Sequence, residues 1–301
     1  MKLHDKITRK LFNKIHLKQI KTSGFERMEN LLSEKNLKLP KNYFKGKVCA
    51  DLGCGSTGVG ALNLLKMGVK EVHLMDMHSH IKKPINKNLA KYKGKYKLYV
   101  GSLEKTPFKS NYFDFVLCQG VIHHMDNDNK GFKEVHRVLK PGGKSHIVVI
   151  GENGIIPDIL FKVIRPKYKK DKKVKKVIED IMNKKISKYK TFFKKNLNTN
   201  GLKLFNFISN YFDDDFLLTM KDRILSPNYY QYNEKDLKKK LDKIGLKKTY
   251  RIKKRVKFNN IRDLVAPMYN HYDHILSRVL YGEGAISLIS TKKKWQRLNP
   301  K

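Results

Sequence analysis

A glycine-rich segment at residues 48–58, VCADLGCGSTG, has the composition of a loop that binds a small ligand. Glycines after a strand permit a tight turn and let the backbone approach a ligand without an intervening Cβ. The helix that follows would point its N-terminal amides at that ligand. Gly53, Gly55 and Gly58 also have the GxGxxG spacing of dinucleotide-binding loops, so the glycines alone do not identify the ligand.

Acidic residues near this loop narrow the choice of ligand. Asp76 ends the next apolar run, where a carboxylate can accept hydrogen bonds from the ribose of either kind of cofactor. Asp51 is more selective because it lies two residues before Gly53. A carboxylate at that point suits a ligand with an ammonium group and would oppose a pyrophosphate.

The elements that must position these residues alternate between short apolar runs and helix-like stretches. Strands are expected at residues 47–52, 72–76, 97–100, 113–118 and 145–150, with helices at 59–67 and 130–139. Such alternation is typical of a parallel sheet with crossover helices, which is an α/β fold. Two more strands are expected at 247–256 and 284–290, after a helix that begins at Asn233 and stops at Gly245.

Two further motifs complete a recognisable set. The fourth strand continues into residues 119–125, QGVIHHM, and residues 139–143, LKPGG, lead into the fifth strand. With the glycine loop and Asp76, they resemble the class I S-adenosylmethionine-dependent methyltransferases, particularly those of ubiquinone and menaquinone pathways. The resemblance covers about residues 46–151 and implies a Rossmann-like seven-stranded sheet with helices on both faces.

The same resemblance implies that S-adenosylmethionine is the cofactor and S-adenosylhomocysteine the product. It places the cofactor on residues that follow the first four strands: Asp51, Gly53, Cys54, Gly55, Asp76, Met77, Ser102, Leu103 and Gln119. The glycine loop and Gln119 would hold the methionine part, Asp76 the ribose hydroxyls, and Met77 with the 102–103 loop the adenine. Two residues depart from the family pattern: Thr57 replaces a glycine and Ser102 replaces an acidic residue.

The acceptor site is expected outside this core. Residues 152–232 and 257–282, the latter with Tyr269, His271, Tyr272 and His274, are expected to fold over the carboxyl edge of the sheet and enclose it. We divide the chain into an N-terminal helical segment (1–45), the cofactor-binding core (46–151), a largely helical lid (152–232) and the completion of the core (233–301), which carries a short insertion at 257–282. His123 and His124 follow the fourth strand, at the sheet edge where ligands bind. One of them, His124 in preference, could act as a general base for a hydroxyl acceptor, or both could only shape the cofactor pocket.

Composition leaves several classes of acceptor and partner open. The formal net charge is +39, and lysines outnumber arginines 56 to 10, which fits an AT-rich genome as well as a nucleic-acid surface. The preferred acceptor is a metabolite, sugar or lipid precursor. The alternatives are RNA as the acceptor, or a non-catalytic role as a cofactor-binding partner subunit.

No apolar run is long enough to span a membrane, although peripheral contact with an anionic membrane is compatible with the charge. Three scattered cysteines predict reduced thiols, a cytoplasmic location and no metal site.

Overall fold

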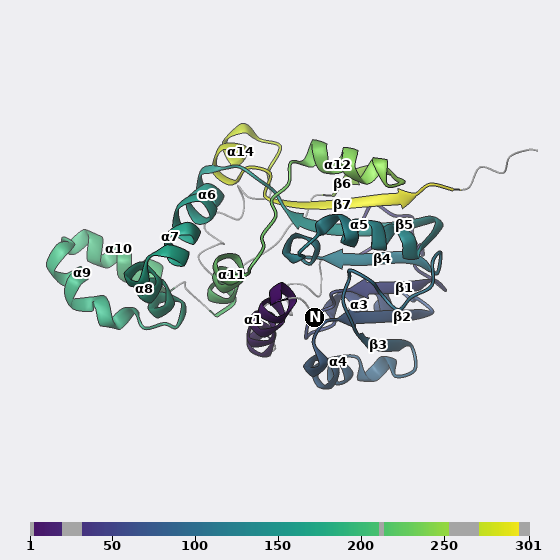
Figure 1. Cartoon of the computed structure of the whole chain (residues 1–301), viewed down its shortest axis with the longest axis horizontal. Helices are drawn as coiled ribbons and strands as arrows, with labels where there is room; N and C mark the ends of the chain where they lie inside the picture. Colours follow the sequence, from purple (N-terminus) through teal and green to yellow (C-terminus); the bar gives the residue numbers. More distant parts are fainter. Residues whose placement is uncertain (1–2, 20–31, 211–213, 253–270, 295–301) are drawn as a thin grey trace, which may run out of the picture.

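The computed structural model describes residues 3–19, 32–210, 214–252 and 271–294. Its centre is a seven-stranded sheet with the order β3-β2-β1-β4-β5-β7-β6 (Figure 1). Neighbouring strands are parallel up to β5, and β7 is antiparallel to both β5 and β6. The strands are β1 (Val48–Leu52), β2 (Glu71–Asp76), β3 (Tyr96–Val100), β4 (Phe113–Gln119), β5 (Leu139–Ile150), β6 (Leu246–Arg251) and β7 (Ala285–Lys292).

Helices cover both faces of this sheet, as the sequence predicted. One face packs against α5 (Asp128–Val138) and α12 (Glu234–Lys243), through apolar side chains such as Phe132 and Leu241. The other packs against α3 (Val59–Lys66), α4 (Lys82–Asn88) and the segment 32–46, through residues such as Leu64 and Phe44. Because both faces are buried, the central strands are almost continuously apolar. The seven-stranded Rossmann-like fold is therefore confirmed.

Local signals explain where several of these elements begin and end. Asn233 caps α12 with its side chain, which accepts hydrogen bonds from the backbone amides of Lys235 and Asp236. The fifth strand starts earlier than expected, because Leu139 already pairs with Phe113 and the Pro-Gly-Gly segment forms an irregularity within β5. The last part of the strand expected at 247–256 lies outside the described residues.

The segment between β5 and α12 is almost entirely helical. It comprises α6 (Ile155–Asp158), the π-helix η4 (Ile159–Ile164), α7 (Arg165–Lys170), α8 (Lys172–Met182), η5 (Ile186–Tyr189), α9 (Lys190–Asn196), α10 (Thr199–Asn210) and α11 (Asp214–Leu225). In Figure 1, α9 and α10 lie far from the sheet, whereas α11 returns to it. A small apolar cluster of its own, centred on Leu160, Met182 and Ile224, joins η4, α8 and α11.

The N-terminal helix α1 (Leu3–Gln19) lies against α11, near the carboxyl ends of the parallel strands (Figure 1). These two helices are remote in the sequence but meet over one edge of the sheet. The short helices η1 (Ser79–Ile81), η2 (Ala90–Tyr92) and η3 (Ile122–His124) follow β2, α4 and β4, and α14 (Ile275–Tyr281) precedes β7. Within the described residues, no helix is long and apolar enough to cross a membrane.

A buried lysine connects the last strand to the helix on the sheet's face. Lys292 of β7 is 8% exposed, and its Nζ donates to Asn111 Oδ1 and to the carbonyl oxygens of His136 and Leu139, each at 2.8 Å. These carbonyls lie at the C-terminal end of α5, where a cation is favoured. The lysine therefore satisfies carbonyls that would otherwise be buried without a donor.

We expect Lys292→Met to lower the free energy of unfolding by about 2 kcal/mol, because it removes hydrogen bonds from a charged donor to buried acceptors. Lys293→Met is the matched control, since Lys293 is exposed and its backbone bond to Gly245 remains. Chemical denaturation of both variants measures the difference. Equal stability of the two variants would show that the Lys292 contacts contribute little.

Candidate functional site

A pocket of about 430 Å³ opens at the carboxyl edge of the parallel strands. All eleven residues that the sequence assigned to the site lie on its wall: Asp51, Gly53, Cys54, Gly55, Asp76, Met77, Ser102, Leu103, Gln119, His123 and His124. Parallel packing brings them together, because the loops that follow β1, β2, β3 and β4 all emerge at the same edge. The volume lies within the range of small-molecule sites.

The glycine loop is shaped by backbone geometry that side chains would prevent. Gly53 has φ +80°, and its amide donates to the Met75 carbonyl at 2.7 Å. A Cβ on Gly53 would come within 2.1 Å of Val121 Cγ2. A side chain at position 53 would thus clash with Val121 in the pocket wall, even before a ligand binds. Glycine is required here for both its φ angle and the close approach.

Asp51 is a buried carboxylate at the end of β1. Its Oδ2 accepts from the Ala61 amide in the first turn of α3 at 3.0 Å, the one hydrogen-bond donor that reaches it among the described residues. Burial raises the pKa of Asp51 to about 7, against the effect of that amide. A buried carboxyl without a cationic partner is suited to a ligand that brings a positive charge.

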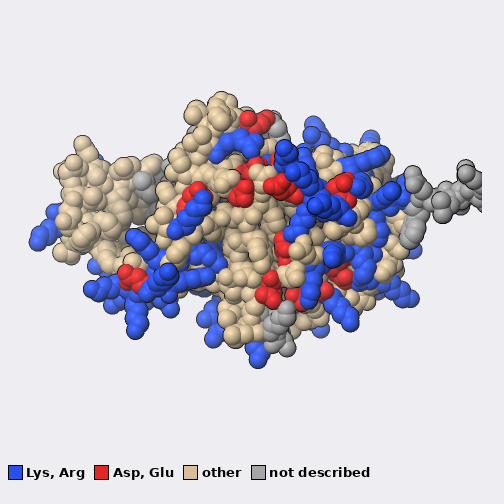
Figure 2. All heavy atoms as spheres, turned by 45° about the horizontal axis from the view of Figure 1, so that its top comes forward, with Lys and Arg blue, Asp and Glu red and all other residues tan. Residues whose placement is uncertain are grey.

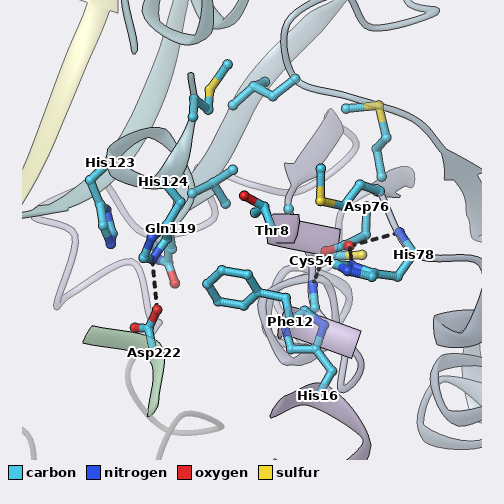
Figure 3. A pocket seen from close by; sticks show the side chains of 18 of the residues that line it. Thr8, Phe12, His16, Cys54, Asp76, His78, Gln119, His123, His124 and Asp222 are labelled. Atoms are coloured by element: carbon cyan, nitrogen blue, oxygen red, sulfur yellow. Dashed lines mark hydrogen bonds and ion pairs between the residues drawn. The ribbon is translucent and has the colours of Figure 1, made fainter. Parts of the chain in front are cut away.

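Asp76, at the end of β2, joins three segments of the pocket wall (Figure 3). Its Oδ2 accepts from the Gly55 amide at 3.0 Å, and its Oδ1 lies 2.6 Å from Nδ1 of His78. The other ring nitrogen of His78 lies 2.8 Å from the Arg9 carbonyl of α1. Burial favours the neutral form of Asp76, but the His78 bond, the histidine charges and the Gly55 amide together hold its pKa below the usual value.

Helix α1 closes the pocket over the glycine loop, and sequence reasoning did not anticipate this. His4, Thr8, Phe12 and His16 line the pocket at helical spacing along one side of α1. Ser56 Oγ also donates to the His16 carbonyl at 3.0 Å. The amphipathic, basic pattern of the first residues was visible in the sequence, but it did not reveal where the helix docks.

Two histidines and an aspartate occupy the far end of the pocket. Nε2 of His124 lies 3.1 Å from Asp222 Oδ1, and Nδ1 lies 3.3 Å from the Asn228 carbonyl oxygen (Figure 3). The Phe12 and Tyr229 rings contact the His124 ring, with centroids 4.8 and 5.0 Å away. Both ring nitrogens of His124 therefore lie next to oxygen atoms of the lid segment, residues 152–232.

His123 has a different environment although it is the adjacent residue. It is 3% exposed, and its Nδ1 is buried without a hydrogen-bond partner. Burial, followed by the charges of His124 and Arg223, holds the pKa of His123 well below the usual histidine value. The ring is therefore neutral near pH 7.

The lid segment contributes only its last part to this pocket. Thr219, Asp222 and Arg223 of α11 and the following Tyr229 line it, whereas α8, α9 and α10 do not. In the second insertion, residues 253–270, including Tyr269, lie outside the described residues. None of its described residues, 271–282, lines the pocket, so His271, Tyr272 and His274 do not enclose it.

Glu104 supplies the acidic side chain that is missing at Ser102. Glu104 lines the pocket two residues later in the same loop, and its amide donates to Ser102 Oγ at 3.2 Å. The family pattern has its acidic residue at position 102, so the sequence alone did not indicate that Glu104 would line the pocket. Sequence reasoning also missed Asp222 and Arg223, because no motif connects α11 to the site.

The amino-acid sequence of the core matches a known protein family, and the match agrees with the fold and the pocket described above. Residues 50–147 match a methyltransferase domain family. This range runs from within β1 to within β5 and contains every pocket residue assigned from the sequence. Residues 50–147 therefore form a methyltransferase domain, and S-adenosylmethionine is its cofactor.

Individual relatives differ in what they act on. A tRNA U34 carboxymethyltransferase of Campylobacter curvus is 31% identical over 111 residues, which cover 36% of each chain. A 2-methyl-6-phytyl-1,4-hydroquinone methyltransferase of Arabidopsis thaliana is 33% identical over 104 residues, covering 33% of this chain and 28% of the relative. The chain spans about half the length, or less, of the curated relatives that it matches first.

The solved structures extend the likeness of the fold beyond the core. A Haloferax volcanii methyltransferase, solved in complex with the Trm112 methyltransferase activator, has a TM-score of 0.54 at 12% identity. The alignment covers 96% of this chain and 99% of that one. At this identity the likeness concerns the fold alone.

The raised pKa of Asp51 predicts pH-dependent cofactor affinity. The carboxyl is neutral below about pH 7 and charged above it, and only the charged form attracts an ammonium group. We expect S-adenosylhomocysteine to bind about tenfold more weakly at pH 6 than at pH 8, since the competent fraction falls by that factor. Calorimetry at a series of pH values measures this.

Asp51→Asn is the control for that prediction. It should bind weakly with no pH dependence around pH 7, while its melting temperature stays at or above that of the wild type because a buried charge is removed. A wild-type affinity that is constant between pH 6 and 8 would contradict an ammonium-binding role for Asp51.

Proposed function

We propose that the protein transfers a methyl group from S-adenosylmethionine to an acceptor of metabolite, sugar or lipid-precursor size. The observation that carries this proposal is the lining of the pocket beyond the cofactor loops, to which Phe12 of α1, Asp222 of α11 and Tyr229 contribute. A half-open pocket of about 430 Å³ with this lining suits a compact acceptor. The Arabidopsis relative, named for a hydroquinone substrate, supports a cyclic lipid precursor and the resemblance to quinone-pathway enzymes.

The residues present fit the cofactor. Gly53 and Gly55 leave the backbone bare, the buried Asp51 carboxylate would hold the ammonium group, and Asp76 would accept from the ribose hydroxyls. Met77 and the loop carrying Ser102, Leu103 and Glu104 would enclose the adenine, and Cys54 and Gln119 the methionine part. When bound, the cofactor supplies an electrophilic methyl group on a positively charged sulfur. The protein's contribution is then chiefly orientation of the acceptor and exclusion of water.

The two histidines would have separate roles. The lid segment approaches His124 on both ring nitrogens, since Nε2 lies 3.1 Å from Asp222 Oδ1 and Nδ1 lies 3.3 Å from the Asn228 carbonyl oxygen. His123 keeps a ring nitrogen, Nδ1, without a hydrogen-bond partner, so it is the better placed candidate for a general base, although its lowered pKa makes it a weak one. We therefore assign His123 to proton removal from a hydroxyl acceptor and His124, with Asp222, to positioning. This reverses the preference that the sequence suggested.

RNA is the second candidate acceptor, and two observations favour it. The Campylobacter curvus relative is named for a tRNA substrate, and the net charge is +39. On the face shown in Figure 2, however, lysines and arginines are spread over many elements with acidic residues among them. Specific recognition of RNA generally uses a concentrated basic surface or aromatic platforms for bases.

The acceptor class can be measured directly. The protein is incubated with cofactor labelled at the methyl group and with fractions of a cell extract, and label is counted in the small-molecule, lipid, RNA and protein fractions. We expect label in the small-molecule or lipid fraction. Label in RNA alone would replace the proposed acceptor by the second candidate. Cofactor binding without label in any fraction would favour the non-catalytic partner subunit.

The histidine assignment predicts different losses in two variants. For a hydroxyl acceptor, His123→Asn should lower kcat by about 10²–10⁴, the usual contribution of a general base, with unchanged cofactor affinity. Because the pKa of His123 is lowered, the wild-type rate should not increase between pH 6 and 8 through this group. Asp222→Asn should mainly raise KM for the acceptor. A His123 variant with full turnover would overturn the assignment.

A further inference from the structure

We propose that His16, Asp76 and His78 form a binding site for a divalent transition-metal ion, with His80 beside it. His16, Asp76 and His78 each offer one ligand atom, and these three atoms lie within 4.8 Å of one another. The three residues come from α1 and from the end of β2, and Figure 3 shows their side chains converging at one wall of the pocket. Nothing in the spacing of the sequence groups them.

Two ring nitrogens in this cluster are buried without a partner. Nδ1 of His16 and Nε2 of His80 have no hydrogen-bond partner in the structure. The His80 ring lies 5.2 Å from that of His78 and 6.4 Å from that of His16, measured between centroids. Buried polar atoms are normally satisfied, so two unpartnered nitrogens in one cluster call for a ligand. A metal ion would take up the lone pair of such a nitrogen, and His80 stands beside the three residues whose ligand atoms lie within 4.8 Å of one another.

His78 already has the outer contact of a metal-binding histidine. Its Nε2 lies 2.8 Å from the Arg9 carbonyl oxygen, which fixes the direction of the ring. Histidines that bind metals usually donate their other N–H to a carbonyl or carboxylate in this way. Its Nδ1 faces Asp76 at 2.6 Å. An ion would replace the proton that Nδ1 donates, and that proton would pass to solvent. The two atoms would move apart to admit the ion, because metal–ligand bonds are about 2.0–2.2 Å long.

The ligand set selects the kind of metal. Two or three imidazoles and one carboxylate suit Zn²⁺, Co²⁺ or Ni²⁺, whereas Mg²⁺ and Ca²⁺ prefer oxygen ligands. The three core ligands would leave a coordination position open toward His80 or toward water. We therefore expect tight binding of zinc-like ions and no comparable affinity for magnesium.

The ion would have two consequences for the protein. It would connect α1 to the sheet through His16, and so hold the helix closed over the glycine loop. It would also occupy the carboxylate that the proposed function assigns to the cofactor ribose. Asp76 already accepts from Gly55 and His78, so little acceptor capacity remains for both ligands. This second consequence rests on the proposed function, and it makes metal and cofactor mutually exclusive.

The site is tested with metal alone. The protein, freed of any histidine tag and of metal by chelation, is titrated with Zn²⁺ by calorimetry and with Co²⁺ by visible absorption. We expect one equivalent to bind, with an absorption spectrum typical of four-coordinate cobalt. His16→Asn should weaken binding at least about tenfold, and His80→Asn should weaken it less or change the cobalt spectrum.

His271→Asn is the matched control, because His271 is exposed and lies outside the cluster. It should bind Zn²⁺ like the wild type. Melting temperatures of all variants show whether the fold is intact. Absence of stoichiometric binding, or equal affinity in the wild type and the His16 variant, would overturn the metal site.

Competition separates this inference from the proposed function. S-adenosylhomocysteine affinity is measured by calorimetry in chelator and again with one equivalent of Zn²⁺. We expect at least a tenfold loss of affinity with Zn²⁺ in the wild type and no such loss in the His16 variant. Failure to bind S-adenosylhomocysteine in chelator would refute the proposed function alone. Unchanged affinity with bound Zn²⁺ would refute mutual exclusion.

Discussion

The Asp76 carboxylate is the contact on which the arrangement of the pocket depends. One oxygen holds the glycine loop after β1 through the Gly55 amide, and the other holds His78, which in turn reaches the Arg9 carbonyl of α1. A single buried charge thus connects the segments after two strands with the N-terminal helix. Its desolvation is offset by the surrounding donors, which keep it ionised.

Closure of the pocket follows from this connection. Helix α1 is held by Ser56 and His78 on the cofactor side and lies against α11 on the other. Between them, Phe12 contacts His124, which is paired with Asp222. This end of the pocket is therefore built from segments that lie more than 200 residues apart. Access to the cofactor loops and the shape of the proposed acceptor site depend on the same two helices.

Adjacent histidines show how the environment assigns chemistry. His123 and His124 share a short helix and are both buried, yet one has two acceptor partners and the other has a nitrogen without any. The second arrangement, together with burial, favours a neutral His123 ring. Asp51 and Asp76 form a similar contrast, since burial raises the pKa of one carboxyl and hydrogen bonds lower that of the other.

The sequence by itself determined the fold and the cofactor loops, because these depend on local patterns. Apolar runs, the glycine spacing and the Asn233 cap each act within a few residues, and parallel strands necessarily bring the loops after them to one edge. Only the tertiary structure decided that α1 and α11 cover this edge, that Glu104 lies in the pocket beside Ser102, and that His16 meets Asp76 and His78. Those contacts depend on how amphipathic helices dock across long sequence separations, and helical periodicity indicates which face is buried but not what it is buried against.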